Sequence, residues 1–319
     1  MTTTEGEKIR DPGYLHLLGS GVLKDRVRLA YQHMEQCDLC ARYCRVNRLK
    51  TTEKAICRTG EQALVHSFGP HYGEEESISG WMGSGAIFFG RCSLHCVFCQ
   101  NWEISQTSAG RSATPDQIAL IMLALQKRGC HNINLVSPSH VVAQIVSAIF
   151  IAAQHGLRLP LVYNTGGYDS LEALQLLDGI IDIYMPDMKY GTSEASRRFS
   201  GVSNYPEVNR AAVREMYRQV GDLVLDDDGL AVRGLLVRHL VLPSDVAGSD
   251  EVLHFIAEQI SPLTYVNLMD QYYPWYRADD FPPLDRSIRQ GEYHRVRQMA
   301  ERHGLHRLDE HRERRRLGI

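Results

Sequence analysis

From residue 86 to residue 269, short apolar runs alternate with amphipathic stretches of helical period. Between the runs, apolar residues recur at helical spacing, as in 114–129, where a Thr-Pro pair opens the stretch and Gly129 ends it. Six strands joined by helical crossovers predict an α/β domain with a parallel sheet, and chemistry is expected at the carboxyl ends of the strands. The runs are 86–89, 132–136, 161–163, 180–185, 235–242 and 265–269.

A cysteine-rich loop follows the first predicted strand. Cys92, Cys96 and Cys99 have the spacing Cys-x3-Cys-x2-Cys within residues 90–101. Three thiolates on one tight loop can hold three corners of a cubane iron–sulfur cluster. No fourth cysteine follows within the loop, so the fourth iron would be open to a ligand that is not protein. The alternatives are three buried thiols or a zinc knuckle completed by His95, because structural zinc usually has four N or S ligands.

A second group of cysteines precedes this loop. Cys37, Cys40, Cys44 and Cys57 have the spacing C-x2-C-x3-C-x12-C, which suits a tetrahedral zinc site or a four-cysteine iron–sulfur cluster. The spacing does not separate the two, and the neighbouring cluster loop favours a second [4Fe–4S] cluster. The basic residues around the group form a solvated face or compensate a negatively charged thiolate centre. The eighth cysteine, Cys130, is expected to be a small buried hydrophobic residue.

Composition limits the class of protein and its partners. The 319 residues carry a formal net charge of -3, so no bulk basic field indicates nucleic acid. No apolar run has the length of a membrane span, and the polar N-terminus lacks a signal-peptide pattern. We therefore expect a cytoplasmic protein, in which clustered cysteines bind metal or act in catalysis rather than form disulfides.

Three parts are predicted along the chain. Residues 1–80 form a cysteine-rich metal-binding module, residues 81–277 form the core, and residues 278–319 form a charged helical tail. Glycine-rich residues 59–85 are interpreted as loops and short strands that lead to the boundary. The basic run at 310–316 is a solvated tail or a docking arm for an acidic partner.

The cysteine loop resembles the signature of the radical S-adenosylmethionine (radical SAM) enzymes. The likeness lies in the cysteine spacing, in Phe98 before the last cysteine and in the preceding strand. It implies a partial (β/α)6 radical SAM barrel, with a flat doubly wound sheet as the alternative fold. It also implies a [4Fe–4S] cluster whose open iron is chelated by S-adenosyl-L-methionine (SAM). Such enzymes cleave SAM reductively to methionine and a 5′-deoxyadenosyl radical, which abstracts hydrogen from a substrate.

Within that superfamily, the chain is similar to the pyruvate formate-lyase activating enzymes. Residues 100–105, 186–189 and 238–243 carry this narrower likeness. It implies that Asp187 and Lys189 lie beside SAM and a target glycine, and that Arg238 lies beside SAM. An ordinary salt bridge at a strand end and an ion pair inside the barrel are the alternatives for these residues. Polar groups at other strand ends are further candidates for SAM contacts: Ser137, Asn164 and Gly166.

The narrower resemblance also implies partners. A reductant such as flavodoxin or ferredoxin would supply the electron, and a glycyl-radical enzyme would supply the target glycine. Two departures separate this chain from the activating enzymes. Its extra cysteines precede the cluster loop, and residues 137–140 read Ser-Pro-Ser-His in place of the usual Gly-Gly-Glu. The alternatives are radical modification of a small molecule or peptide, a non-enzymatic redox sensor or electron carrier, and a zinc-binding interaction module.

Overall fold

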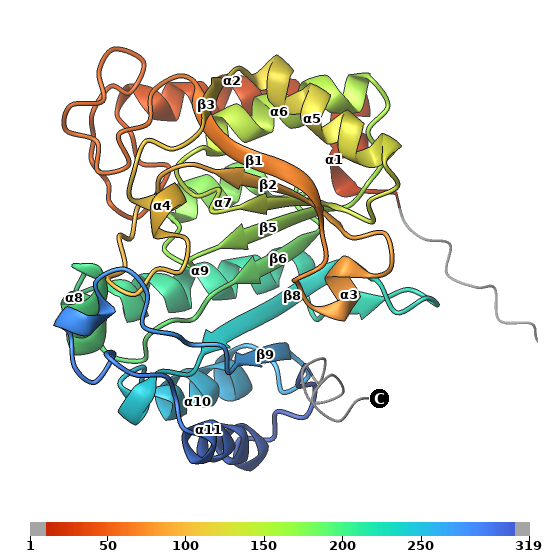
Figure 1. Ribbon diagram of the computed structural model, residues 1–319. Helices are drawn as coiled ribbons and strands as arrows, with labels where there is room; N and C mark the ends of the chain where they lie inside the picture. Colours follow the sequence, from red (N-terminus) through yellow and green to blue (C-terminus); the bar gives the residue numbers. More distant parts are fainter. Residues whose placement is uncertain (1–10, 310–319) are drawn as a thin grey trace, which may run out of the picture.

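The computed structural model describes residues 11–309, and its centre is one mixed β-sheet (Figure 1). Six strands of this sheet are mutually parallel and are neighbours in the order of the sequence. The predicted α/β class with a parallel sheet is therefore confirmed. The six are β2 (Ser84–Phe89), β4 (Ile133–Val136), β5 (Leu161–Thr165), β6 (Ile183–Pro186), β8 (Ala231–Leu240) and β9 (Tyr265–Met269).

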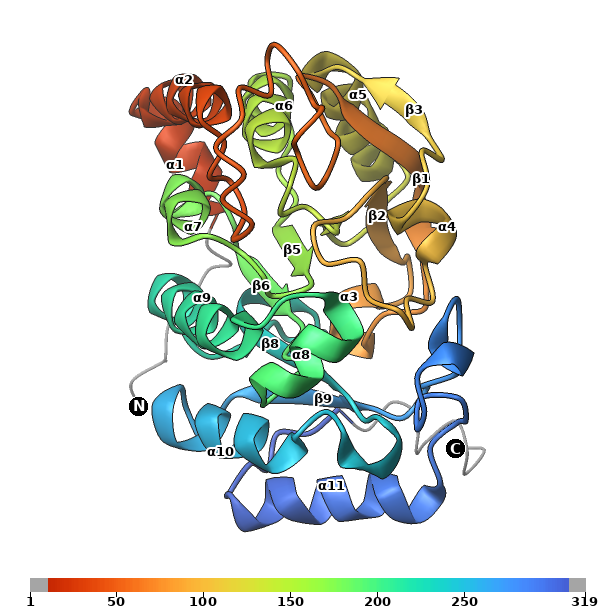
Figure 2. The ribbon, with the colours of Figure 1, turned by 90° about the vertical axis from the view of Figure 1, so that its left-hand side faces the viewer.

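Helices cover the outer face of this sheet. Figure 2 looks at the carboxyl ends of the strands and shows the sheet curved like an open C, with the helices outside. The predicted helix at 114–129 is α5, whose cap is the Thr114 side chain accepting the Gln117 amide. The named architecture, a partial (β/α)6 barrel, stays a prediction. The covering helices are α5 (Pro115–Lys127), α6 (Val142–Gln154), α7 (Leu171–Leu177), α9 (Tyr205–Val220) and α10 (Ser249–Gln259).

The N-terminal part contributes to both faces of the domain. Helices α1 (Gly13–Gly19) and α2 (Val22–Glu35) pack on α6, and α2 also packs on α7. Strand β1 (Ala63–His71) pairs antiparallel with β2, and β3 (Arg111–Ala113) pairs antiparallel with β1. Residues 59–85 were expected to hold only loops and short strands, so the nine-residue β1 is a correction. β1 belongs to the same sheet as the core, and the boundary near residue 80 stays a prediction.

The remaining elements are short pieces at either end of the parallel strands and the helix α11 near the end of the chain. The strand predicted at 235–242 begins earlier, at Ala231, and its first residues pair antiparallel with β7. In the tail predicted at 278–319, the long helix begins at Gln290. These elements are α3 (Glu76–Ser79), α4 (Trp102–Ser105), α8 (Ser193–Ser200), β7 (Val224–Leu225), η1 (Pro243–Asp245), η2 (Ala278–Asp280) and α11 (Gln290–Arg302).

The end of the described chain runs beside β9. The amide of Val266 donates to the carbonyl of Arg307 at 2.9 Å, and the amide of Asp309 donates back to Val266 at 2.9 Å. The basic run at 310–316 lies outside the described residues. Across residues 11–309, none of the helices combines the length and the apolar character that a membrane crossing requires.

Side chains inside the curve of the sheet form layers, because alternate residues of each strand point inward. The layer nearest the amino ends of the strands is apolar and includes Ile78 of α3. Charged and amide side chains form the next layer, above which a cavity opens toward the carboxyl ends. The apolar layer is Ile78, Val162, Ile183, Met185, Leu223, Ala231 and Leu236.

Candidate functional site

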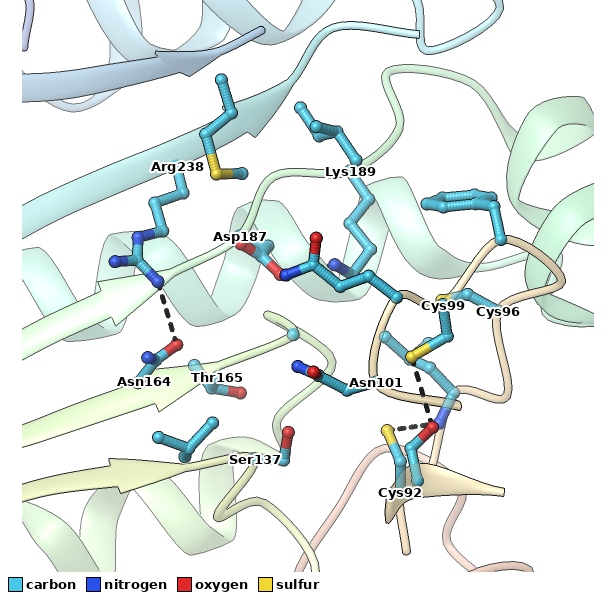
Figure 3. A pocket seen from close by; sticks show the side chains of 18 of the residues that line it. Cys92, Cys96, Cys99, Asn101, Ser137, Asn164, Thr165, Asp187, Lys189 and Arg238 are labelled. Atoms are coloured by element: carbon cyan, nitrogen blue, oxygen red, sulfur yellow. Dashed lines mark hydrogen bonds and ion pairs between the residues drawn. The ribbon is translucent and has the colours of Figure 1, made fainter. Parts of the chain in front are cut away.

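A cavity of about 420 Å³ lies at the carboxyl ends of the parallel strands (Figure 3). The three cysteines of the loop after β2 form one side of it. Every other core residue singled out from the sequence also lines this cavity, so the fold brings together groups from five strand ends. Those residues are Ser137, Asn164, Gly166, Asp187, Lys189 and Arg238.

The cysteine loop is held from several directions. Ser200, the last residue of α8, donates its hydroxyl to the Cys96 sulfur at 3.0 Å. The Leu94 amide lies 3.4 Å from the Cys92 sulfur, and the Ser105 hydroxyl lies 3.2 Å from the Cys99 sulfur. Each sulfur thus has at least one polar contact, and all three line the cavity.

Burial makes these thiols costly to ionise without a partner. It raises the pKa of the Cys92 thiol, and it raises the pKa of Cys99 to about 11, with the neighbouring Cys96 adding to both shifts. Thiolates in such a place require a cation, and iron supplies one. The loop residues therefore fit an iron–sulfur cluster.

No three or more His, Cys, Asp or Glu side chains in residues 11–309 converge on a point that would hold one metal ion. A cubane cluster binds its thiolates on different iron atoms, so it does not require that convergence. The N-terminal cysteines likewise do not converge on a point that would hold one metal ion. Cys37, Cys40 and Cys57 are buried there and Cys44 is partly buried.

Asp187 and Lys189, at the end of β6, form an ion pair beside the loop. Burial alone would lower the pKa of the Lys189 ammonium. The negative charges of Asp187 and Cys96 outweigh it and hold the pKa of Lys189 above its usual range. The site therefore contains a permanent cation close to a cluster cysteine. Asp187 and Lys189 thus form the strand-end salt bridge that was the alternative interpretation of these residues. Their contacts with SAM or with the substrate stay predictions.

Two polar residues of α9 fix this strand end, and the sequence reading had not identified them. The Tyr205 hydroxyl accepts from the Lys189 amide at 3.0 Å and lies 2.9 Å from the Gly166 carbonyl. Asn209 donates its amide group to the carbonyls of Gly167 and Asp187 at 2.9 and 3.0 Å. Their spacing of four residues on the buried face of an amphipathic helix was the available signal.

Gly166 lies next to the cluster loop. A Cβ atom at this position would lie 2.9 Å from a terminal methyl carbon of Leu94. The end of β5 therefore touches the loop between its first two cysteines. The contact of Gly166 with SAM stays a prediction.

Arg238 lies on the floor of the cavity, in the charged layer. Its guanidinium forms ion pairs with Glu74 and Glu75, and its Nε donates to Glu75 at 2.8 Å. This is the interior ion pair that the sequence left as an alternative to a place beside SAM. Burial alone would raise the pKa of Glu75, but Arg238 and the Asn267 amide lower it. Asn164 lies 3.5 Å from the guanidinium (Figure 3).

Neither glutamate was predicted as a site residue. Both precede α3, in the glycine-rich stretch that was interpreted as loops. Glu74 also accepts a hydrogen bond from Asn134 at 3.0 Å. The run of three glutamates from Glu74 was visible in the sequence, but nothing local indicated that two of them would be buried.

The loop after β4, residues 137–140, supports the cysteine loop from below. His140 donates from Nε2 to the Gly90 carbonyl at 2.9 Å. Burial lowers the pKa of His140 to about 3, so this imidazole stays neutral at physiological pH. The Ser139 hydroxyl lies 2.9 Å from that of Thr165 on β5. These groups brace the loop, while Ser137 remains free to line the cavity.

Comparison with known proteins agrees with this geometry. Residues 86–222 match the profile of the family described as the Radical SAM superfamily. An uncharacterized protein of Methanocaldococcus jannaschii, MJ0674, is 28% identical over 299 residues, covering 91% of this chain and 82% of that protein. A second uncharacterized protein of that organism, MJ0808, is 22% identical over 271 residues, covering 78% and 73%.

The matched segment contains the cysteine loop, the ends of β4 and β5, and the Asp187–Lys189 pair. The family match supports radical SAM chemistry, and it implies a [4Fe–4S] cluster and SAM as cofactors. Residues 86–222 of this chain are thus similar to the Radical SAM superfamily.

Proposed function

We propose that this chain is a radical SAM oxidoreductase similar to the pyruvate formate-lyase activating enzymes, with a glycine of a partner protein as its target. The observation that carries the proposal is the loop of Cys92, Cys96 and Cys99, which faces a cavity lined by charged strand ends. When bound, the cluster supplies one electron that cleaves SAM to methionine and a 5′-deoxyadenosyl radical, which takes a hydrogen atom from the substrate.

The chain's own residues position and shield the reactants. The Lys189 ammonium stays protonated beside the loop and can attract the SAM carboxylate. Asn164, Ser137 and the Gly166 carbonyl are candidate partners for the ribose and ammonium groups of SAM. Phe98 packs edge-on against Tyr190 and Tyr272, with ring centroids 6.3 and 5.9 Å away. This aromatic packing excludes water from one side of the loop.

Three further assignments complete the proposal. The N-terminal cysteines bind a metal centre of their own, a second [4Fe–4S] cluster or zinc. A cytoplasmic reductant such as flavodoxin or ferredoxin supplies the electron. The partner is a glycyl-radical enzyme, while a small molecule or peptide is the alternative substrate. A redox sensor or electron carrier would not need the charged cavity beside the loop.

The first experiment measures SAM cleavage. The protein is reconstituted and reduced without oxygen, SAM is added, and 5′-deoxyadenosine is quantified by chromatography. Cys96→Ala is expected to abolish product. Cys130→Ala is the matched control, because Cys130 is buried outside both cysteine groups, and it is expected to retain product. Absence of product from a wild-type chain with a loaded, reduced cluster would contradict the proposal.

The second experiment identifies the hydrogen donor. A peptide that models a glycyl-radical loop, deuterated at the glycine Cα, is added to the same reaction. Deuterium in the 5′-deoxyadenosine supports a glycine target. Product that forms at an unchanged rate and contains no deuterium would exclude that peptide as a donor and favour a different substrate class.

A further inference from the structure

The N-terminal cysteine segment, residues 36–62, lies directly against the cluster loop and contacts it through Arg42. Arg42 donates from Nε to the Ser93 carbonyl at 2.6 Å and from Nη2 to the Leu94 carbonyl at 3.2 Å. Ala41 packs in the same apolar cluster as Leu94 and Cys96. The two cysteine groups are therefore joined in space, although two strands of the sheet, β1 and β2, separate them in sequence.

The contacts of Arg42 determine where two loop amides point. In a trans peptide, the carbonyl of one residue and the N–H of the next lie on opposite sides of one rigid plane. Fixing the Ser93 carbonyl therefore directs the Leu94 N–H the other way, where it lies 3.4 Å from the Cys92 sulfur. Fixing the Leu94 carbonyl likewise fixes the direction of the His95 N–H.

Arginine is suited to this task. Its planar guanidinium presents donors in a fixed fork, so one side chain can hold two successive carbonyls in a set relation. Hydrogen bonds to the sulfurs are among the features that set the reduction potential of an iron–sulfur cluster. Arg42 thus acts on Cys92 through the peptide units of Ser93 and Leu94, without touching the sulfur itself.

Arg48 links the same segment to the loop from the other side. Its side chain is only 2% exposed and donates to the Thr59 carbonyl at 2.6 Å, the Cys37 sulfur at 3.4 Å and the His140 carbonyl at 2.7 Å. The ring of His140 in turn holds the carbonyl of Gly90, two residues before Cys92.

Arg48 also indicates the charge of the cysteine group. In residues 11–309, the groups that contact its guanidinium include no carboxylate. An uncompensated buried guanidinium is costly, and the sulfur of Cys37 lies 3.4 Å from Arg48 Nη1. Metal binding would make that sulfur anionic and would hold Arg48, and with it residues 36–62, in place.

We propose that the metal-bound N-terminal segment sets the geometry of the radical SAM cluster loop, with Arg42 as the positioning residue that aims the Leu94 amide at the Cys92 sulfur. This inference rests on the proposed function, because it requires a cluster on Cys92, Cys96 and Cys99. It assigns the N-terminal centre a role in tuning that cluster, whether the centre is zinc or iron–sulfur.

The test compares Arg42→Gln and Arg42→Lys with Arg45→Gln in the full, reconstituted chain. Arg45 is the matched control, since it lies three residues away, is exposed and pairs with Asp38. Potentials are followed by electron paramagnetic resonance, and the signal of the loop cluster is assigned by its absence in Cys96→Ala. In Arg42→Gln we expect at least a tenfold lower ratio of reduced to oxidised cluster at a fixed potential, about 59 mV. Arg42→Lys should shift less, and Arg45→Gln should match the wild type.

A second arm tests the segment as a whole. Cys40→Ser is expected to lose the zinc, or the additional iron and sulfide, of the N-terminal centre and to show the same direction of shift. Combined with Arg42→Gln, it should add little, because both changes act through one contact. Hydrogen exchange at the Leu94 and His95 amides should quicken in Arg42→Gln and Cys40→Ser.

The outcomes separate the two proposals. A wild-type loop that takes up no cluster would overturn the proposed function and this inference with it. A normal wild-type cluster whose potential and amide exchange are unchanged in Arg42→Gln would overturn this inference alone. An N-terminal segment that binds neither zinc nor iron would also overturn it.

Discussion

Arg238 offers a sharp test of how the cavity floor is built. Replacing it by methionine removes the cation that two buried glutamates share and leaves both carboxylates without a counter-ion. Removing one partner of a buried ion pair typically costs 3–5 kcal/mol, so we expect the free energy of unfolding to fall by about that amount at pH 7. Glu75 is fully covered and Glu74 nearly so, which places the change in the range for buried pairs.

The effect should depend on pH with opposite sign in the two proteins. In the wild type, Arg238 holds the pKa of Glu75 below its ordinary 4.5, so this pair stabilises the fold above that pH and less so as pH falls. Without the arginine, burial raises the pKa of the same carboxyl above its unfolded value. The variant is then stabilised by protonation and should recover stability relative to the wild type between pH 7 and pH 5.

The assay is urea unfolding followed by tryptophan fluorescence at several pH values between 5 and 8. Arg238→Met is compared with the wild type and with a triple variant that also carries Glu74→Gln and Glu75→Gln. The triple variant should recover most of the loss, because no uncompensated charge remains. The reasoning is refuted if Arg238→Met differs from the wild type by less than about 0.5 kcal/mol at pH 7, as a surface change would. A difference that does not shrink toward pH 5 would refute it equally.

Three further outcomes are expected. Ser200→Ala removes the hydroxyl that donates to the Cys96 sulfur, so a redox titration should show a more negative cluster potential, with Thr as the rescuing residue. Lys189→Met leaves the Asp187 carboxylate unpaired beside the cavity, and chromatography should show SAM cleavage reduced by about tenfold or more, whereas an unchanged rate would remove Lys189 from the site. Burial raises the pKa of Asp182 to about 6, above its unfolded value of 3.8, so this group weakens the fold as pH rises from 4 to 6. The unfolding midpoint of Asp182→Asn should lack this pH dependence. Identical pH slopes in the variant and the wild type would contradict the prediction.

The parallel strands and the cluster loop could be predicted because their signals are local. Each strand is a short apolar run, and Cys92, Cys96 and Cys99 lie within eight residues. β1 could not be predicted in the same way. Its sequence contains glycine and proline, and most of its residues are partly or fully exposed, so it has no clear alternating pattern.

The rest of the site depends on contacts between distant residues. Glu75 meets Arg238 across 163 positions, and Arg42 meets Ser93 across 51. The segments around Glu75 and Arg42 are compatible with exposed charged loops, and only the folded sheet brings them to Arg238 and Ser93. Tyr205 and Asn209 could be predicted only in part. The sequence shows a polar side chain on the buried face of a helix, but it does not show which groups that side chain contacts.

The borders of the sheet limit how a protein substrate can be recognised. On one side, β1 and the three-residue β3 cover the parallel strands, and on the other, residues 307–309 pair with β9. An extended polypeptide therefore cannot add a strand to β2, and at β9 the backbone of Val266 is already paired, although strand addition is a common way of capturing a flexible segment. A target loop that reaches the cavity would enter with its tip first, between the cysteine loop and the strand ends. The length and flexibility of that loop would then matter more than its β-propensity.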